Sequence, residues 1–256
     1  MRHTRNIKDK LLLELSSKEN SRGDLRDYQT NFLRNFSRSY TLFISVKDTS
    51  EDEEIKNTAL EQHIISLISI FETFLRDIFS FIVKSDSNFK EEIITSYNLK
   101  INIADTNIPI EIVDILSEFF NFQDIRDIEY AFKPIIAQGN FFEDIGNFVL
   151  PFYNHKNEEI RKFCLNVSIS NWKELLNEII SERHKLTHDA NYVTVFQYGF
   201  FDRYQKTILY FPQVFSLLIC AKYNLPYIAL HIKDKKIIPY ICELEDILSK
   251  WELVDE

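Results

Sequence analysis

Residues 55–84 read IKNTALEQHIISLISIFETFLRDIFSFIVK, and this stretch decides the fold. Large apolar residues recur along it at spacings of three and four, which is the period of an α-helix. One set comprises Leu60, Ile64, Leu67, Phe71, Phe74, Ile78 and Phe81, and a second comprises Ile65, Ile68, Leu75 and Phe79. A helix with both sets is apolar over most of its girth, so we expect it at the centre of the domain or at a dimer interface.

The composition favours long helices in the rest of the chain as well. Among 256 residues there are only 4 glycines and 6 prolines, and 45% of the residues are hydrophobic, which suffices for a core. We therefore predict a mainly α protein, a helical bundle with a small C-terminal β-hairpin appendage. The predicted parts are an N-terminal helical extension over 1–54, the bundle over 55–195, and a C-terminal helix plus the hairpin over 196–256.

Other segments carry weaker signals of secondary structure. Apolar residues over 25–36 recur at helical spacing. They lie within the segment 1–40, in which basic residues outnumber acidic ones. This segment is either a surface helix or an electropositive rim for RNA. The remaining predicted helices cover 110–120, 124–137, 205–223 and a segment that begins near Trp172, while 141–152 is predicted to be a packed connector. The hairpin is predicted to pair 228–232 with 236–241, with its turn at 233–235.

Charge and cysteine usage restrict the location and the partners. The net charge of −9 argues against a wholly basic surface for non-specific nucleic-acid binding, although a local basic pocket remains compatible with it. Cys164, Cys220 and Cys242 lack metal-ligand spacing and are expected to be reduced, mostly buried thiols. No signal peptide is recognised, and the apolar run 208–221 is too short to span a bilayer. We expect a cytoplasmic protein without a membrane partner.

The stretch Ser181–Asp189, SERHKLTHD, concentrates the chemistry of the chain. Arg183 supplies a fixed positive charge, whereas His184 and His188 belong to the residue type that titrates near neutral pH. Together these side chains can hold a phosphodiester and move a proton while the 2′-hydroxyl of RNA acts as the nucleophile. No glycine-rich phosphate loop, serine nucleophile motif or nicotinamide fingerprint is present, so no cofactor is predicted.

Two charged residues interrupt apolar stripes. Glu72 falls within the second stripe of the central helix, and Arg183 continues the stripe of the helix that begins at Trp172, because it lies four residues after Ile179 and three after Ile180. A buried charge without a partner costs on the order of 3–5 kcal/mol. We therefore predict that Glu72 and Arg183 meet across the bundle. A helix-end ion pair or partial exposure of Glu72 remains the alternative.

The motif Arg183-His184-Lys185-Leu186-Thr187-His188 resembles the signature of HEPN domains, an arginine followed by four to six residues and a histidine. Phe71-Glu72-Thr73-Phe74 is similar to the first core helix of that family, which also carries an embedded acid. The resemblance covers roughly residues 55–195. It implies an all-α bundle and a metal-independent endoribonuclease, often a toxin or an antiviral effector, that acts as a homodimer and can have an antitoxin or defence-system partner.

The same resemblance implies roles for the site residues. His188 acts as general base or acid, Arg183 holds the scissile phosphate, His184 assists, and Glu72 orients Arg183. The products are a 2′,3′-cyclic phosphate and a 5′-hydroxyl end. One HEPN toxin subclass carries a modified tyrosine two residues after the histidine. Here that position is Ala190, and the nearest tyrosine is Tyr192, which argues against a nucleotidyltransferase antitoxin.

Three alternatives compete with a ribonuclease. His184 and His188, four residues apart, could bind zinc, but no third ligand is evident and the general-base Glu of a His-Glu-x-x-His motif is absent. Arg183 and the histidines could instead satisfy buried acids at a helix end. The chain could also be a catalytically inactive HEPN-like interaction or regulatory module.

Overall fold

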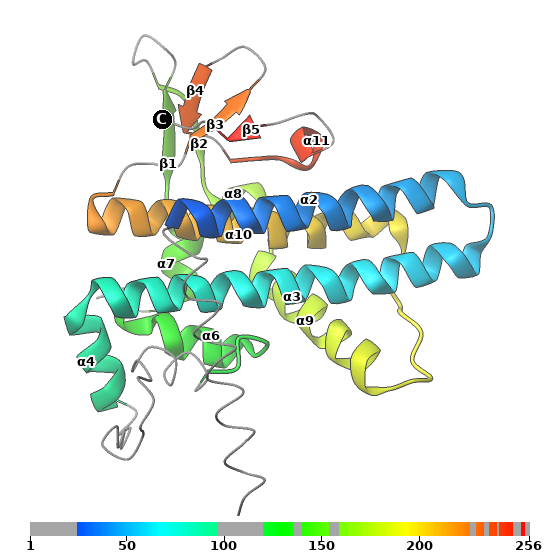
Figure 1. Cartoon of the computed structure of the whole chain (residues 1–256), viewed down its shortest axis with the longest axis horizontal. Coiled ribbons are helices and arrows are strands. Elements are labelled where there is room, and N and C mark those ends of the chain that lie inside the picture. The colour runs from blue at the N-terminus through cyan, green and yellow to red at the C-terminus, as the bar shows by residue number, and fades with distance from the viewer. Residues whose placement is uncertain are drawn as a thin grey trace, which may run out of the picture.

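Helices make up most of the part of the chain that the computed structural model describes, and small strands lie at one side (Figure 1). The described residues are 25–96, 120–135, 140–153, 159–225, 229–232, 236–239, 241–247 and 252–253. The predicted mainly α class is thus confirmed.

Two long antiparallel helices, α2 (Leu25–Thr49) and α3 (Glu53–Ser85), lie side by side (Figure 1). The turn between them ends at Asp52, whose Oδ1 accepts hydrogen bonds from the backbone N–H groups of Glu54 at 2.8 Å and Ile55 at 3.3 Å. These bonds satisfy N–H groups that a helix start leaves unpaired. The helix predicted over 55–84 is therefore confirmed as α3.

The α3 helix is central because both of its apolar stripes are covered. It contacts α2, α9 (Trp172–His188), α10 (Tyr198–Tyr223) and α4 (Ser87–Ser96). Phe71 and Phe79 are fully buried, and Phe71 meets Phe211 of α10 edge to face with ring centroids 5.4 Å apart. One face of α3 nevertheless remains polar and accessible, with Thr58, Gln62, Ser69 and Thr73 exposed.

Short elements complete the helical part. They are α6 (Ile125–Phe132), a 3-10 turn (Lys133–Ile135), α7 (Phe141–Asn147), α8 (Leu165–Ser168) and α11 (Leu244–Ile247). The helix predicted over 124–137 is found up to Ile135. The helix predicted over 110–120 lies outside the described residues, apart from the buried Phe120. Residues 1–24, with much of the predicted basic segment, also lie outside them.

The α10 helix begins at Tyr198, earlier than the predicted start at Gln205, and continues through Pro212. A proline inside a helix removes one N–H donor and disturbs the preceding turn. Gln213 Nε2 donates to the Leu209 carbonyl at 2.9 Å and to the Cys242 carbonyl at 3.1 Å. The buried Gln213 side chain therefore donates a hydrogen bond to a carbonyl in the turn that Pro212 disturbs. It also binds the C-terminal segment at Cys242.

The strands form two small antiparallel sheets. The predicted hairpin is confirmed as β3 (Ala229–Ile232) paired with β4 (Lys236–Pro239), and β5 (Glu252–Leu253) extends this sheet in the order β4-β3-β5. The predicted turn at 233–235 lies outside the described residues. The sequence did not predict the pair β1 (Leu150–Tyr153) and β2 (Glu159–Phe163). The predicted connector 141–152 therefore holds α7 and most of β1.

A single hydrophobic core joins residues of α2, α3, α9, α10 and α11, so the three predicted parts share it. Cys220 and Cys242 are buried in this core and Cys164 is half-buried, all as free thiols. Within the described residues, no helix combines the length and apolar character that a bilayer crossing needs.

His63 is a buried polar residue between α2, α3 and α10. Its ring is 2% exposed, stacks on Phe43 at 4.8 Å between centroids, and meets Phe201 edge to face. Nδ1 lies 2.7 Å from Ser39 Oγ, and Nε2 lies 3.1 Å from Gln205 Nε2. Burial lowers the pKa of His63 from an ordinary 6.5 to about 3, because the apolar surroundings disfavour the imidazolium.

This buried histidine predicts a pH-dependent stability. Below pH 6.5 the unfolded chain binds a proton at His63, whereas the folded chain binds this proton only near pH 3. The free energy of unfolding is therefore highest above pH 6.5, as far as this group is concerned, and it falls as the pH drops below 6.5. For this one proton the slope approaches about 1.4 kcal/mol per pH unit as the pH falls well below 6.5, and it is smaller near pH 6.5 itself. Urea unfolding between pH 7 and 5 should show it for wild type and for Ser39→Ala, which keeps the histidine. His63→Gln should lower the slope, and an unchanged slope in that variant would contradict the assignment.

Candidate functional site

The α9 helix carries the candidate site and packs against α3 and α10. It begins at Trp172, as predicted, although Asn171 adopts a left-handed conformation at φ 60° and makes no side-chain cap. The buried stripe is also as predicted, formed by Trp172, Leu175, Leu176, Ile179 and Ile180. Because this stripe faces the core, the residues of the last turn of α9 that lie outside the stripe are at the surface.

Arg183 is tied to the central helix through a glutamine. Arg183 Nη1 donates a short hydrogen bond to Gln123 Oε1, and Gln123 Nε2 donates a short hydrogen bond to Glu72 Oε2. The other carboxylate oxygen of Glu72 pairs with Arg76 Nη2 at 3.1 Å, one turn along α3. We call the four hydrogen-bonded side chains of Arg183, Gln123, Glu72 and Arg76 the arginine–glutamine–glutamate network.

The predicted meeting of Glu72 and Arg183 across the bundle is therefore found in an indirect form, because Gln123 is hydrogen-bonded to both side chains. Glu72 also has an ion-pair partner in its own helix, Arg76. An amide side chain has an oxygen that accepts and a nitrogen that donates, so Gln123 serves a guanidinium and a carboxylate at once. Both charges thus gain partners while remaining separated by a neutral residue.

The segment before α6 places Gln123. Phe122 is fully buried and packs against Phe79, and the Arg76 guanidinium lies 5.7 Å from the centroid of its ring. The backbone N–H of Gln123 donates to Asn121 Oδ1 at 3.1 Å. Burial of the neighbouring phenylalanine therefore anchors the backbone from which the Gln123 side chain reaches both charged groups.

The Arg183 guanidinium keeps unused donors. Its Nε is buried, and within the described part of the chain neither Nε nor Nη2 donates a hydrogen bond to any residue. Unpaired buried donors are uncommon in proteins, so each one calls for an explanation. Nη2 is the guanidinium nitrogen from which a bound anion, such as a phosphate, could accept a hydrogen bond, because Nε is enclosed by protein.

The two histidines lie together at the exposed end of α9. The ring centroids of His184 and His188 are 4.5 Å apart, and both side chains are exposed. Residues four apart share one face of a helix, which is the arrangement predicted from the spacing. Thr187 Oγ1 donates to the carbonyl oxygens of Arg183 at 3.0 Å and His184 at 3.1 Å. No hydrogen bond joins Arg183 to either histidine among the described residues.

A metal site requires more ligands than this pair supplies. In the described part of the chain, no group of three or more histidine, cysteine, aspartate and glutamate side chains is arranged to hold a metal ion. Structural and catalytic zinc sites use at least three protein ligands.

Glu182, which was not predicted as a site residue, is the most deeply buried charged residue of the motif. It is 2% exposed, whereas Arg183 is half-buried. Its carboxylate accepts hydrogen bonds from Tyr192 Oη at 2.8 Å, Thr194 Oγ1 at 2.7 Å and the Val195 backbone N–H at 3.2 Å. The signal was present, because Glu182 follows Ile179 by three residues and extends the same apolar stripe as Arg183.

Glu182 fastens the segment that follows the motif to α9. Burial and the hydrogen bond to Glu182 raise the pKa of Tyr192, so the phenol stays protonated and donates. Lys185 Nζ lies 3.6 Å from Glu182 Oε2 and 5.3 Å from the centroid of the Tyr192 ring. The last turn of α9 is consequently held on both sides, by Gln123 and by residues 192–195.

Comparison with protein-family models, with curated proteins and with solved structures finds no match to this chain.

The arginine–glutamine–glutamate network predicts that substitution of Gln123 lowers the stability of the fold. Gln123→Leu removes two hydrogen bonds to charged groups and leaves Arg183 without a described partner, so we expect a loss of about 1–3 kcal/mol in the free energy of unfolding. Gln62→Leu, at an exposed position of α3, is the matched control and should change stability by less than about 0.5 kcal/mol. If urea unfolding shows equal losses of stability in Gln123→Leu and Gln62→Leu, the hydrogen bonds of Gln123 do not stabilise the fold.

Glu182 predicts a local effect. Glu182→Gln replaces an acceptor oxygen by a donor among groups that donate, so the hydrogen bonds to Tyr192, Thr194 and Val195 cannot all persist. We expect faster amide hydrogen exchange at Val195 and a loss of about 1–3 kcal/mol. Glu174→Gln, exposed in the first turn of α9, should leave that exchange rate unchanged. Unaltered protection at Val195 in Glu182→Gln would refute the role of this carboxylate.

Proposed function

We propose that this protein is a metal-independent endoribonuclease of the HEPN type, with Arg183 and His188 as its catalytic residues. The observation that carries the proposal is a half-buried arginine, held by Gln123 with donors left over, next to two exposed histidines at one helix end. RNA is the substrate because its 2′-hydroxyl supplies the nucleophile, and the site then needs only proton transfer and charge stabilisation.

The reaction assigns one task to each side chain. His188 removes the proton of the 2′-hydroxyl, whose oxygen attacks the adjacent phosphorus as the bond to the 5′-oxygen breaks. A second imidazole gives a proton to that leaving oxygen, which yields a 2′,3′-cyclic phosphate and a 5′-hydroxyl end. Arg183 binds the phosphate and stabilises the charge that develops on its oxygens. Glu72 acts through Gln123 as a positioning residue for Arg183.

A second copy of the chain completes the site in this proposal. On a helix, residues five apart differ in direction by about 140°, so Arg183 and His188 of one copy address a single phosphate only loosely. Two α9 ends related by a two-fold axis would surround the phosphate and supply both the general base and the general acid. We therefore propose a homodimer that assembles through the face carrying Arg183 and His188.

The biological setting that we propose is a cytoplasmic toxin or antiphage-defence effector, with an antitoxin or defence-system protein as a further partner. The second candidate function is an inactive HEPN-like interaction module. It draws support from the bond between Arg183 and Gln123, which would hold α9 in place without any substrate.

Cleavage in the absence of metal tests the proposal. Wild-type protein should cut single-stranded RNA in EDTA and leave 2′,3′-cyclic phosphate ends. Arg183→Ala and His188→Ala should each lower the rate by at least about 100-fold, the usual loss when a general acid–base group or an oxyanion donor is removed. Asn177→Ala, at an exposed position of the same helix, is the control for substitution in α9.

Circular dichroism and urea unfolding of all three variants separate loss of catalysis from loss of fold. Full cleavage by folded His188→Ala would reject the assignment of this residue. Absence of cleavage by wild type over a panel of RNAs, together with a stable complex formed through the α9 end, would favour the interaction module.

A further inference from the structure

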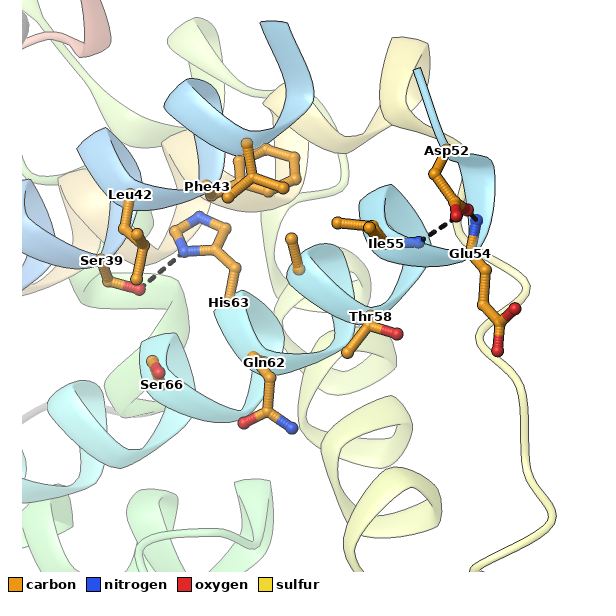
Figure 2. Close-up of a pocket in the computed structure, with 12 residues that line it drawn as sticks. Ser39, Leu42, Phe43, Asp52, Glu54, Ile55, Thr58, Gln62, His63 and Ser66 are labelled. Atoms are coloured by element: carbon orange, nitrogen blue, oxygen red, sulfur yellow. Dashed lines mark hydrogen bonds between the residues drawn. The ribbon is translucent and has the colours of Figure 1, made fainter. Parts of the chain in front are cut away.

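Two cavities lie in the groove between α2 and α3. The larger has a volume of about 460 Å³ and lies between the last turns of α2 and the first turns of α3 (Figure 2). The smaller, about 250 Å³, lies between Asn31 and Asn35 of α2 and Ser69 and Thr73 of α3. Ser39 and Ser66 line the first cavity one helical turn from the second, so the two follow one another along the groove.

The lining residues of this groove repeat at spacings of three and four on both helices. Examples are Asn35, Ser39 and Leu42 on α2 and Ala59, Gln62 and Ser66 on α3. This is the spacing at which a third helix packs along a pair of helices. Small residues at Ser39, Ala59, Ser66 and Ser69 allow its backbone to approach closely. The groove from Ile55 to Asp77 is about 33 Å long at the helical rise, which matches about 22 helical residues.

Apolar side chains stand exposed at the larger cavity. Leu42 is 68% exposed and Ile55 is 52% exposed, one on each helix, and the floor between them contains Phe43, Val46 and Ala59. Figure 2 shows Leu42, Phe43 and Ile55 around this space, together with the His63 ring and Ser39. Exposed apolar residues that border a concave site mark a binding surface more often than single ones do.

The same end of the groove is acidic. Asp48, Glu51, Asp52, Glu53 and Glu54 are all exposed at the turn between the two helices. Lys56 pairs with Glu53 at 2.6 Å, and Asp52 caps α3, so these two carboxylates are already engaged. Glu54 lines the larger cavity, and the cluster as a whole attracts positive charge.

We propose that the α2–α3 groove binds a basic amphipathic helix of a partner protein. Its apolar face, with side chains at helical spacing, fills the larger cavity against Leu42 and Ile55. Its lysines or arginines lie over the acidic turn 48–54. This is recognition of a helix in a groove, in which apolar anchors supply affinity and charge sets the partner and its direction. Binding at this groove does not require the proposed ribonuclease activity.

A synthetic peptide tests the groove directly. The probe is a fluorescein-labelled 21-residue peptide of leucine, alanine and lysine, with leucines at positions 1, 5, 8, 12, 15 and 19 and lysines concentrated at one end, in two versions that place the lysines at the N-terminal or the C-terminal end. Glutamate replaces lysine in the matched control peptide. Fluorescence anisotropy with the full chain should give micromolar binding for one lysine version. The glutamate peptide should bind at least about tenfold more weakly, because like charges then face each other.

Variants of the protein test whether the peptide binds in the groove or on another apolar surface. Leu42→Glu and Ile55→Glu should each weaken binding by at least about tenfold, which is the expected effect of losing one buried aliphatic contact. Val167→Glu alters another exposed apolar residue, 83% exposed on α8, and should leave binding unchanged. Circular dichroism checks that the variants are folded.

Three results would overturn the proposal: no binding of either lysine peptide, equal binding by the groove variants and wild type, or equal binding of the glutamate peptide. Self-association of wild type that Leu42→Glu abolishes in sedimentation would also overturn it, because a second copy would then occupy the groove.

Discussion

The Gln123 side chain, placed between Glu72 of α3 and Arg183 of α9, is the interaction on which the candidate site depends. A guanidinium and a carboxylate that left water without partners would destabilise the fold by several kcal/mol. A direct ion pair would satisfy both groups but would also consume the arginine. The neutral amide gives each charge a hydrogen bond and holds Arg183 by one nitrogen only, so that Nε and Nη2 have no acceptor among the described residues. The core thereby fixes the position of the arginine and leaves it able to bind an anion.

Two other buried polar residues show different solutions to the same problem. Glu182 stays in the core because three donors from residues 192–195 converge on its carboxylate. His63 stays there as a neutral ring, stacked on Phe43 and hydrogen-bonded at the edge that faces Ser39. The first arrangement supports the turn that carries His184 and His188. The second lines the larger cavity of the α2–α3 groove and makes the stability of the fold depend on pH.

Periodic patterns allowed the sequence to predict the long elements. The stripes of α3 and α9, the start of α9 at Trp172 and the β3–β4 hairpin are all found, because hydrophobic spacing over many residues reports directly which face is buried. The early start of α10 and the short strand β1, which contains Pro151, were not predicted, since tertiary packing outweighs local preference there. Gln123 and His63 were not predicted for a related reason. Each is hydrogen-bonded to residues that are distant in sequence, so spacing within one segment could not reveal its partners. The burial of Glu182, in contrast, could have been predicted from its spacing after Ile179.

The central claim is that the end of α9 forms a phosphate site around the unused donors of Arg183. The most direct measurement is a nitrogen–proton NMR titration of the full chain with an RNA oligonucleotide whose 2′-hydroxyls are replaced by hydrogen, so that it binds without being cut. The account predicts that the Arg183 Nε–H resonance and the ring resonances of His184 and His188 shift together and saturate at one concentration. In Gln123→Leu the same shifts should require more oligonucleotide. Saturable binding that leaves Arg183 and both histidines unshifted would contradict the account.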